Sequence, residues 1–485
     1  MYRPCPVKTT FSKLNEKPMV TRNTNNPKNR AIMITVRNRQ KIEKWFTAPL
    51  LLILLLCSTA AFGQADSVNK NKPDRVEWFS NLGYGLFLHW GVDSQIGTVI
   101  SHSLVGASDA YQKKFFEQLP KTFDPSRFNP DAWARMAKVS GVKYVVFTAK
   151  HHSGFCMFDT KTTDFNIMNT PYGKDITREI VDAFRKQGIA IGIYFSPDDF
   201  HFLYEQGTTI SRRNPEVKPV NNPGLMQHDK QQIRELLTNY GPIDIMFIDG
   251  PAEGLKELAW KVNPNLVITR GAMETPEIAP STTQGLPGSL LTDVWEACYT
   301  MGTSWQYKPT NEHYRSGTDL IENLIESRAK NGNMLLNVGP KPDGELPQQQ
   351  KNTMREIGTW LFINGESVYG VKPWNVSNED NIWFTYSKNR DVVYAIIRQP
   401  DWKWGTRKTI TLKSVKGKDN TKVSVLGQSG EVLEYHPDTK PETAWQNTQQ
   451  GLKITATRAQ RIYNDRTWPN PVVLKVTHPE AASSR

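Results

Sequence analysis

Carboxylates that directly follow apolar segments are the first candidates for chemistry in this chain of 485 residues. Asp249 closes the segment 243–250 (IDIMFIDG), and Glu274 and Glu277 come shortly after the next one, 266–271 (LVITRG). Two acids at neighbouring strand ends suit glycoside hydrolysis, in which one carboxylate attacks the anomeric carbon and the other protonates the leaving oxygen. A retaining enzyme holds them about 5–5.5 Å apart. An isolated Asp at this place could equally cap a helix or brace a loop.

Histidines, a tyrosine and an arginine also stand at the ends of apolar segments: His89, His151, His152, Tyr194 and Arg270. Zinc needs three or four ligands, and no HExxH or CxxC motif accompanies the histidine pair. Adjacent residues of a strand also point to opposite sides. We therefore predict no metal and no other cofactor. A neutral imidazole can instead hydrogen-bond to hydroxyl groups, and a nearby cation keeps a nucleophilic carboxylate ionised.

Three tryptophans near these positions have two interpretations. Trp90, Trp295 and Trp305 could stack on the apolar face of a sugar ring, or they could be ordinary core residues. The sequence alone leaves both open.

The elements that must position these residues alternate in type. Near-continuous apolar segments alternate with amphipathic stretches, several of which end in Gly, and this pattern is typical of a parallel sheet covered by helices. The repetition predicts an α/β fold, a distorted (β/α)8-like barrel over residues 66–374, whose chemistry gathers at the carboxyl ends of the strands. The expected strands are 85–91, 144–152, 189–197, 243–250, 266–271 and 334–340, and the expected helices are 131–141, 175–188, 228–241 and 319–332.

The remaining residues, 375–485, have a different sequence pattern. Short alternating segments such as 382–387, 392–398 and 472–476 are separated by Asp, Asn, Gly and Pro. This pattern predicts a small antiparallel β-sandwich that begins near residues 372–380.

The formal charge of +12 lies mostly at the N-terminus. Residues 1–65 hold eleven Lys and Arg against two acids, a net of +9, which leaves only +3 for the rest of the chain. A basic stretch precedes the apolar run 48–62, which is short for a bilayer span, and small residues follow it. We predict a signal peptide within residues 1–65, with Met33 as a candidate true start, and no nucleic-acid partner.

Export would make the mature protein secreted or periplasmic, beginning near Gln64 or Asp66 and carrying no membrane span. A retained N-terminal anchor is the alternative. Lipid attachment at Cys57 is not favoured, because Leu56 stands where a small residue is expected. Cys156 and Cys298 remain after cleavage and are too few for a disulfide framework.

Several motifs together resemble the family 29 glycoside hydrolases, the retaining α-L-fucosidases. They are YGLFLHWG (84–91), the stretch 129–155 containing KHHSGF, FDTKTTDFNIM after it, GNMLLNVGPKPDGELPQQQ and INGESVYG, and they run in order from Val76 to Trp374. The resemblance implies a distorted barrel followed by a β-sandwich, and catalysis without metal or cofactor.

Carried over position by position, the resemblance implies that Asp249 is the nucleophile and Glu277 the acid/base. Glu274 and Glu296 compete for the acid/base role, and Glu296 fits better as a structural or sugar-contacting acid. The positions implied to bind the sugar are His89, His151, His152, Tyr194, Arg270, Trp305 and Glu296.

This chain departs from the family pattern in four places: Ser153, Phe247, the stretch 101–111, and the pair Gln306-Tyr307. The carboxylate pair is retained, so we predict a secreted exo-acting α-L-fucosidase whose partner is a fucosylated glycan. The altered positions leave an α-L-galactosidase as an alternative, since L-galactose adds one hydroxyl to the same sugar. A non-catalytic carbohydrate-binding protein is a third hypothesis, which the matched acids disfavour.

Overall fold

The computed structural model describes residues 69–278, 286–398 and 401–482. The predicted signal peptide, with Met33 and Cys57, lies outside the described residues. Within them, no helix is both long enough and apolar enough to cross a membrane.

Eight parallel strands form one curled sheet in the order β5-β4-β3-β2-β1-β8-β7-β6. Their side chains are almost entirely buried, as expected for strands covered on both faces. Among the described residues no ladder joins β5 to β6, so the barrel stays open at this seam. The predicted fold, a distorted (β/α)8-like barrel, is confirmed. The strands are β1 (Tyr84–Leu88), β2 (Tyr144–Lys150), β3 (Ala190–Phe195), β4 (Ile245–Ile248), β5 (Val267–Ile268), β6 (Glu277–Ile278), β7 (Trp295–Thr300) and β8 (Gly332–Val338).

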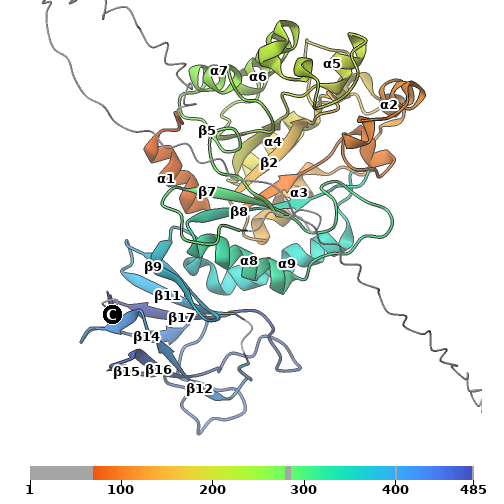
Figure 1. Cartoon of the computed structure of the whole chain (residues 1–485). Helices are drawn as coiled ribbons and strands as arrows, with labels where there is room; N and C mark the ends of the chain where they lie inside the picture. Colours follow the sequence, from red (N-terminus) through yellow and green to blue (C-terminus); the bar gives the residue numbers. More distant parts are fainter. Residues whose placement is uncertain (1–68, 279–285, 399–400, 483–485) are drawn as a thin grey trace, which may run out of the picture. The chain divides into compact units, whose positions relative to one another are not determined.

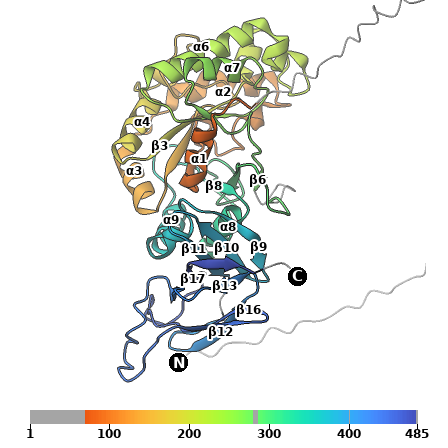
Figure 2. The ribbon, with the colours of Figure 1, turned by 90° about the vertical axis from the view of Figure 1, so that its left-hand side faces the viewer.

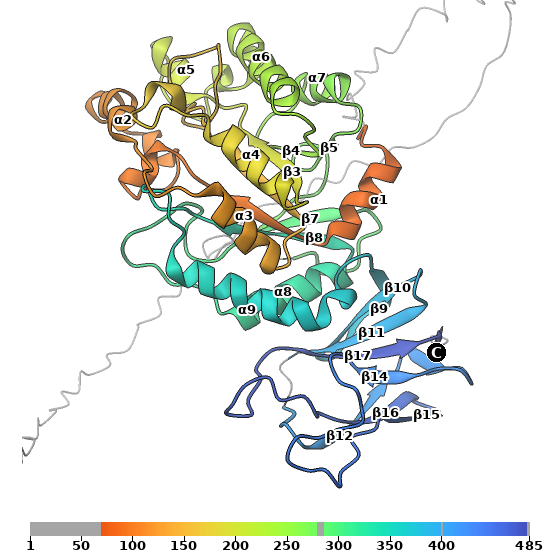
Figure 3. The same cartoon turned by 180° about the vertical axis from the view of Figure 1, so that it is seen from behind.

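Helices surround this sheet, with α3 and α4 on the side that Figure 3 shows and α6 and α7 near β4 and β5 (Figures 1 and 3). Side chains at the N-caps fix several starts, for example Asp175, whose carboxylate accepts from the backbone N–H of Arg178 at 2.8 Å. Helix α6 begins earlier than predicted because Asn222 caps it and Pro223 occupies its first turn. The helices are α1 (Pro73–Leu82), α2 (Asp109–Thr122), α3 (Pro130–Val139), α4 (Ile176–Lys186), α5 (Phe200–Glu205), α6 (Pro223–Asn239), α7 (Leu255–Val262), α8 (Gly317–Ala329) and α9 (Gln348–Asn364).

Antiparallel strands follow α9. A five-stranded sheet has the order β14-β17-β11-β10-β9, a three-stranded sheet the order β12-β16-β15, and β13 pairs with β18. Figure 2 shows the two larger sheets as separate layers, which is the predicted sandwich. The division proposed at residue 375 falls inside β9. The strands are β9 (Lys372–Glu379), β10 (Ile382–Ser387), β11 (Val392–Ile397), β12 (Arg407–Leu412), β13 (Val415–Gly417), β14 (Val423–Val425), β15 (Ala444–Thr448), β16 (Gly451–Thr457), β17 (Val472–Thr477) and β18 (Pro479–Ala481).

A buried ion-pair cluster anchors the end of β2. Lys150 Nζ lies 2.7 Å from Asp229 Oδ1 on α6 and 3.3 Å from Asp199 Oδ2, and all three side chains are at most 3% exposed. Asp199 also caps α5 by accepting from the backbone N–H of Phe202 at 2.9 Å. Because neighbours on a strand point to opposite sides, tying Lys150 to the helices aims the next residue, His151, at the mouth of the barrel.

We predict that Lys150→Met lowers the free energy of unfolding by about 3–5 kcal/mol, since it leaves two carboxylates buried without their cation. Urea unfolding followed by far-UV circular dichroism measures the change. Lys186→Met on α4 is the matched control, because the Lys186 side chain is 71% exposed. Equal stability of the two variants would show that the cluster does not hold β2.

Candidate active site

A cavity of about 170 Å³ lies at the carboxyl ends of the barrel strands. Its lining includes eight of the nine residues predicted for the site, and only Glu296 is missing from it. The strand ends therefore converge as the parallel sheet requires. The lining residues are Phe87, His89, His102, His151, His152, Tyr194, Arg212, Phe247, Asp249, Arg270, Glu277, Cys298 and Trp305.

Asp249 follows β4 and receives two polar contacts. The hydroxyl of Tyr194 donates to Asp249 Oδ2 at 2.7 Å, and Arg270 Nε lies 3.0 Å from Oδ1. Burial by itself would raise the pKa of Asp249, but Arg270, Tyr194 and nearby cationic side chains outweigh it and lower the pKa below its ordinary value. The carboxylate is therefore ionised at neutral pH, the form that a nucleophile needs.

The same guanidinium contacts the second carboxylate. Arg270 Nη1 pairs with Glu277 Oε1, so Arg270 lies between Asp249 and Glu277. Glu277 begins β6, opposite Cys298 on β7. Two carboxylates on one guanidinium, facing one small cavity, form an arrangement suited to attack and protonation at a single glycosidic bond.

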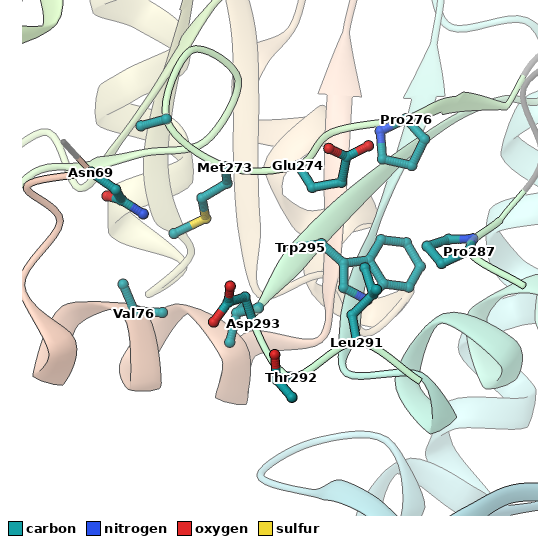
Figure 4. Close-up of a pocket in the computed structure, with 12 residues that line it drawn as sticks. Asn69, Val76, Met273, Glu274, Pro276, Pro287, Leu291, Thr292, Asp293 and Trp295 are labelled. Carbon is teal, nitrogen blue, oxygen red and sulfur yellow. The ribbon is translucent and has the colours of Figure 1, made fainter. Parts of the chain in front are cut away.

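Glu274 lies in a different cavity. Together with Met273, Asp293 and Trp295 it lines a hollow of about 560 Å³ beside α1 and the start of β7 (Figure 4). Of the two acids in the stretch 274–277, only Glu277 lines the cavity that contains Asp249.

Glu296 is fully buried inside the barrel and does not line the cavity. The hydroxyl of Tyr144 donates to Glu296 Oε1 at 2.7 Å, and burial raises the pKa of Glu296 to about 7. Because Glu296 is absent from the cavity lining and its carboxylate is bonded to Tyr144, its placement favours the structural alternative over the sugar-contacting one. Trp90 and Trp295 are likewise core residues, 1% and 0% exposed, and of the three tryptophans considered only Trp305 reaches the cavity.

The hydrogen bonds of His151 assign its tautomer. Ser101 Oγ accepts from the backbone N–H of Ser153 at 2.9 Å and lies 2.8 Å from His151 Nδ1. Since no other described residue accepts the hydroxyl proton of Ser101, that proton goes to His151 Nδ1, and Nε2 carries the ring proton. Burial and the neighbouring histidines hold the pKa of His151 well below its ordinary value, so the ring is neutral.

His152 takes the opposite tautomer. Ser196 donates its hydroxyl proton to the carbonyl oxygen of Asp198 at 3.0 Å, so Ser196 Oγ accepts from His152 Nδ1–H at 2.5 Å. The Nε2 lone pair then accepts from Arg212 Nη2. Burial, followed by the charge of Arg212, keeps the pKa of His152 well below its ordinary value.

His89 offers the lone pair of its Nε2 as a hydrogen-bond acceptor in the cavity. The amide nitrogen of Asn337 donates to the carbonyl oxygen of Trp305, so Asn337 Oδ1 accepts from His89 Nδ1–H at 2.5 Å. Burial lowers the pKa of His89 to about 4. The cavity thus combines an N–H donor on His151 with a lone pair on His89, and a sugar hydroxyl can satisfy either one.

His151, His152 and Asp249 place possible ligand atoms within 4.8 Å of one another. The donor set does not suit a cation, however. His152 has both ring nitrogens in hydrogen bonds, and Asp249 is already paired with Arg270. Two guanidinium groups at the same place also repel positive charge.

Sequence reasoning missed several residues of the cavity, notably His102, Arg212 and Cys298. His102 begins the short 3-10 helix His102–Leu104, and its ring centroid lies 5.2 Å from that of His152. Arg212 lies in the segment between α5 and α6. The departure of the stretch 101–111 from the family pattern was the available indication for His102 and for Ser101. The altered Gln306, by contrast, is 2% exposed and donates to the carbonyl oxygen of Thr98.

Comparison with known proteins shows which proteins this chain is similar to. The alpha-L-fucosidase family matches residues 58–366. The tissue alpha-L-fucosidase of Rattus norvegicus is 29% identical over 442 residues, which cover 81% of this chain and 91% of that protein. The alpha-L-fucosidase of Dictyostelium discoideum is 28% identical over 79% of this chain and 89% of its own length. Alpha-L-fucosidase isoenzyme 1 from Paenibacillus thiaminolyticus superimposes with a TM-score of 0.67 at 27% identity, covering 84% of this chain and 99% of that structure.

The tautomer assigned to His151 can be tested through Ser101. Ser101 has a φ of 56°, so Ser101→Gly removes the hydroxyl without straining the backbone. We predict that kcat/KM on an aryl glycoside of the preferred sugar falls about tenfold, the cost of one buried hydrogen bond. We also predict that ¹⁵N NMR shows the His151 proton no longer confined to Nε2.

Ser103→Gly is the control, because Ser103 lies in the 3-10 helix His102–Leu104, its hydroxyl accepts from Tyr111, and it does not line the cavity. Wild-type kinetics and an unchanged tautomer in Ser101→Gly would refute the positioning role of Ser101.

Proposed function

Since the chain belongs to the alpha-L-fucosidase family, we propose that it is a retaining exo-glycosidase that releases terminal α-L-fucosyl residues from glycans. The observation that carries this proposal is the pair Asp249 and Glu277, held by one guanidinium in a cavity of about 170 Å³. A cavity of this size suits one sugar ring, which is the requirement for exo-action.

In the proposed mechanism Asp249 Oδ attacks the anomeric carbon, and Glu277 donates a proton to the leaving oxygen. A covalent fucosyl ester forms on Asp249. Glu277, now a carboxylate, takes a proton from water as that water attacks the anomeric carbon. The bond from this carbon to Asp249 Oδ breaks, which frees the Asp249 carboxylate and leaves Glu277 protonated for the next cycle. When the ester is cleaved, Asp249 becomes a carboxylate again. Tyr194 and Arg270 stabilise this negative charge, because both contact Asp249 directly.

The neutral imidazoles would orient the sugar. His151 offers an N–H, and His89 offers a lone pair, so hydroxyl groups at fixed positions of the ring are matched and a sugar that lacks them is disfavoured. Trp305, whose ring centroid lies 5.1 Å from that of His89, supplies an apolar wall for the ring.

The two carboxylates differ in how their removal should act. We predict that Asp249→Ala loses on the order of 10³-fold or more in kcat/KM on every fucoside, because no other group traps the reacting carbon from that face. Glu277→Ala should lose far less with an aryl fucoside, whose leaving group needs no proton, than with a natural disaccharide. Azide should then rescue Glu277→Ala and give α-fucosyl azide, since the anion needs no base and attacks the anomeric carbon of the β-linked ester from the opposite face.

Glu274→Ala is the matched control, because Glu274 lines the other cavity. If that variant shows the leaving-group dependence and Glu277→Ala does not, Glu277 is the wrong acid. Assaying the aryl α-L-galactoside in parallel separates the two sugars. A wild type that binds but cleaves neither would indicate a carbohydrate-binding protein.

We also propose that the protein is exported, on the basis of the basic and apolar composition of residues 37–62. The exported chain should begin near Gln64 or Asp66, and the intact mass of the exported protein tests this. A species that keeps residues 33–60 unmodified would mean a membrane anchor instead of a cleaved signal peptide.

A further inference from the structure

A second, larger cavity adjoins the sugar cavity. It measures about 450 Å³ and shares Arg212, Asp249 and Arg270 with the first. We call it the outer cavity. Its other lining residues are Asp198, Val217, Lys218, Gly250, Pro251 and Gly271, from the segments that follow β3, β4 and β5.

The lining of the outer cavity holds one more cation than acids, and one of these cations, Arg270, also pairs with Glu277 of the sugar cavity. The three cations are Arg212, Lys218 and Arg270, and the two acids are Asp198 and Asp249. Each acid is already paired, Asp198 with Arg212 Nε at 3.2 Å and Asp249 with Arg270 Nε at 3.0 Å.

Of the three cations in this lining, Lys218 belongs to neither of these ion pairs. Its side chain is exposed and makes no ion pair with any residue in the part of the chain that the structure describes. It lies in the segment between α5 and α6, six residues after Arg212, whose side chain is 47% exposed. An anion in the outer cavity would therefore meet one unpaired ammonium and one partly exposed guanidinium.

The position of the outer cavity relates it to the cleaved bond. The anomeric carbon must approach Asp249, and the leaving oxygen departs from the opposite face of that carbon, on the side of Glu277. Glu277 pairs with Arg270, and Arg270 lines both cavities, so the rest of the glycan starts beside Arg270, where the two cavities adjoin. The sugar cavity has room for one ring, and the remainder must extend beyond it.

From these observations, and resting on the proposed function, we infer that the outer cavity receives the part of the glycan next to the fucosyl residue and selects for an anionic group there, a carboxylate or a sulfate. Lys218 is the residue that sets this selectivity, by direct contact with the anion.

The test compares kcat/KM on three α-L-fucosyl disaccharides whose second sugar is neutral, carries a carboxylate, or carries a sulfate. We expect the wild type to prefer the anionic substrates, and added salt to reduce the preference. Lys218→Gln should lower the anionic-to-neutral ratio about three- to fivefold, the range of a solvent-exposed ion pair, while Lys218→Glu should lower it further and Lys218→Arg should retain it.

Lys186→Gln, with the same charge change on α4, is the control and should keep the wild-type ratio. A preference for only one anion identifies which group the subsite takes. Equal rates on all three substrates, or a ratio that Lys218→Gln leaves unchanged, would overturn the inference while leaving the fucosidase proposal intact. If no fucoside is cleaved at all, the proposed function itself fails, and the inference fails with it.

Discussion

One guanidinium between two carboxylates is the interaction on which the site depends. Asp249 and Glu277 are both acids that line one small cavity. Arg270 contacts both, and it offsets the burial that would otherwise raise the pKa of Asp249. The ring of Phe247 lies 5.7 Å from the Arg270 guanidinium and provides an apolar surface beside it. A change at Arg270 would therefore alter the position of both acids and the pKa of Asp249.

The parallel sheet brings these three side chains together. Asp249 follows β4 and Arg270 follows β5, whereas Glu277 begins β6 opposite Cys298, which lies inside β7. The curl of the parallel sheet brings these three positions to one cavity. The buried pairs of Lys150 hold β2 against α6 and the start of α5 in the same way. Hydrogen bonds also set the tautomers of two histidines in the cavity, because serine hydroxyls decide which ring nitrogen of His151 and of His152 carries the proton.

Sequence patterns predicted the strand ends well, because a short, wholly apolar segment followed by a polar residue is a local feature. They could not predict which residues inside a strand face the cavity. Glu296 illustrates this limit. Every residue of β7 is buried, so the sequence does not distinguish a residue that faces the barrel interior from one that lines the cavity. Glu277 was assigned by family resemblance, since β6 is a two-residue strand with no periodic pattern.

Apart from Cys298 on β7, the residues that were missed lie outside the strands. His102 and Arg212 reach the cavity, and Ser101 contacts His151, from segments whose course is decided by tertiary contacts, such as the hydrogen bond from the Ser101 N–H to Asp93 Oδ2 at 2.6 Å. No apolar pattern marks such positions. The extent of α6 was underestimated for a related reason: its start depends on a cap and a proline, and not on hydrophobic periodicity.

The central claim is that Asp249 forms a covalent bond to the sugar, and trapping that ester tests it most directly. A 2-deoxy-2-fluoro-α-L-fucosyl fluoride should form the ester but lose it slowly, because the fluorine at carbon 2 destabilises the oxocarbenium-like transition state and the fluoride leaving group favours the first step. Peptide mass spectrometry should then find the added fluorofucosyl mass on Asp249, and no labelled peptide in Asp249→Ala. A label on Glu277 or on any other residue, or steady turnover of the reagent without a labelled peptide, would contradict the account.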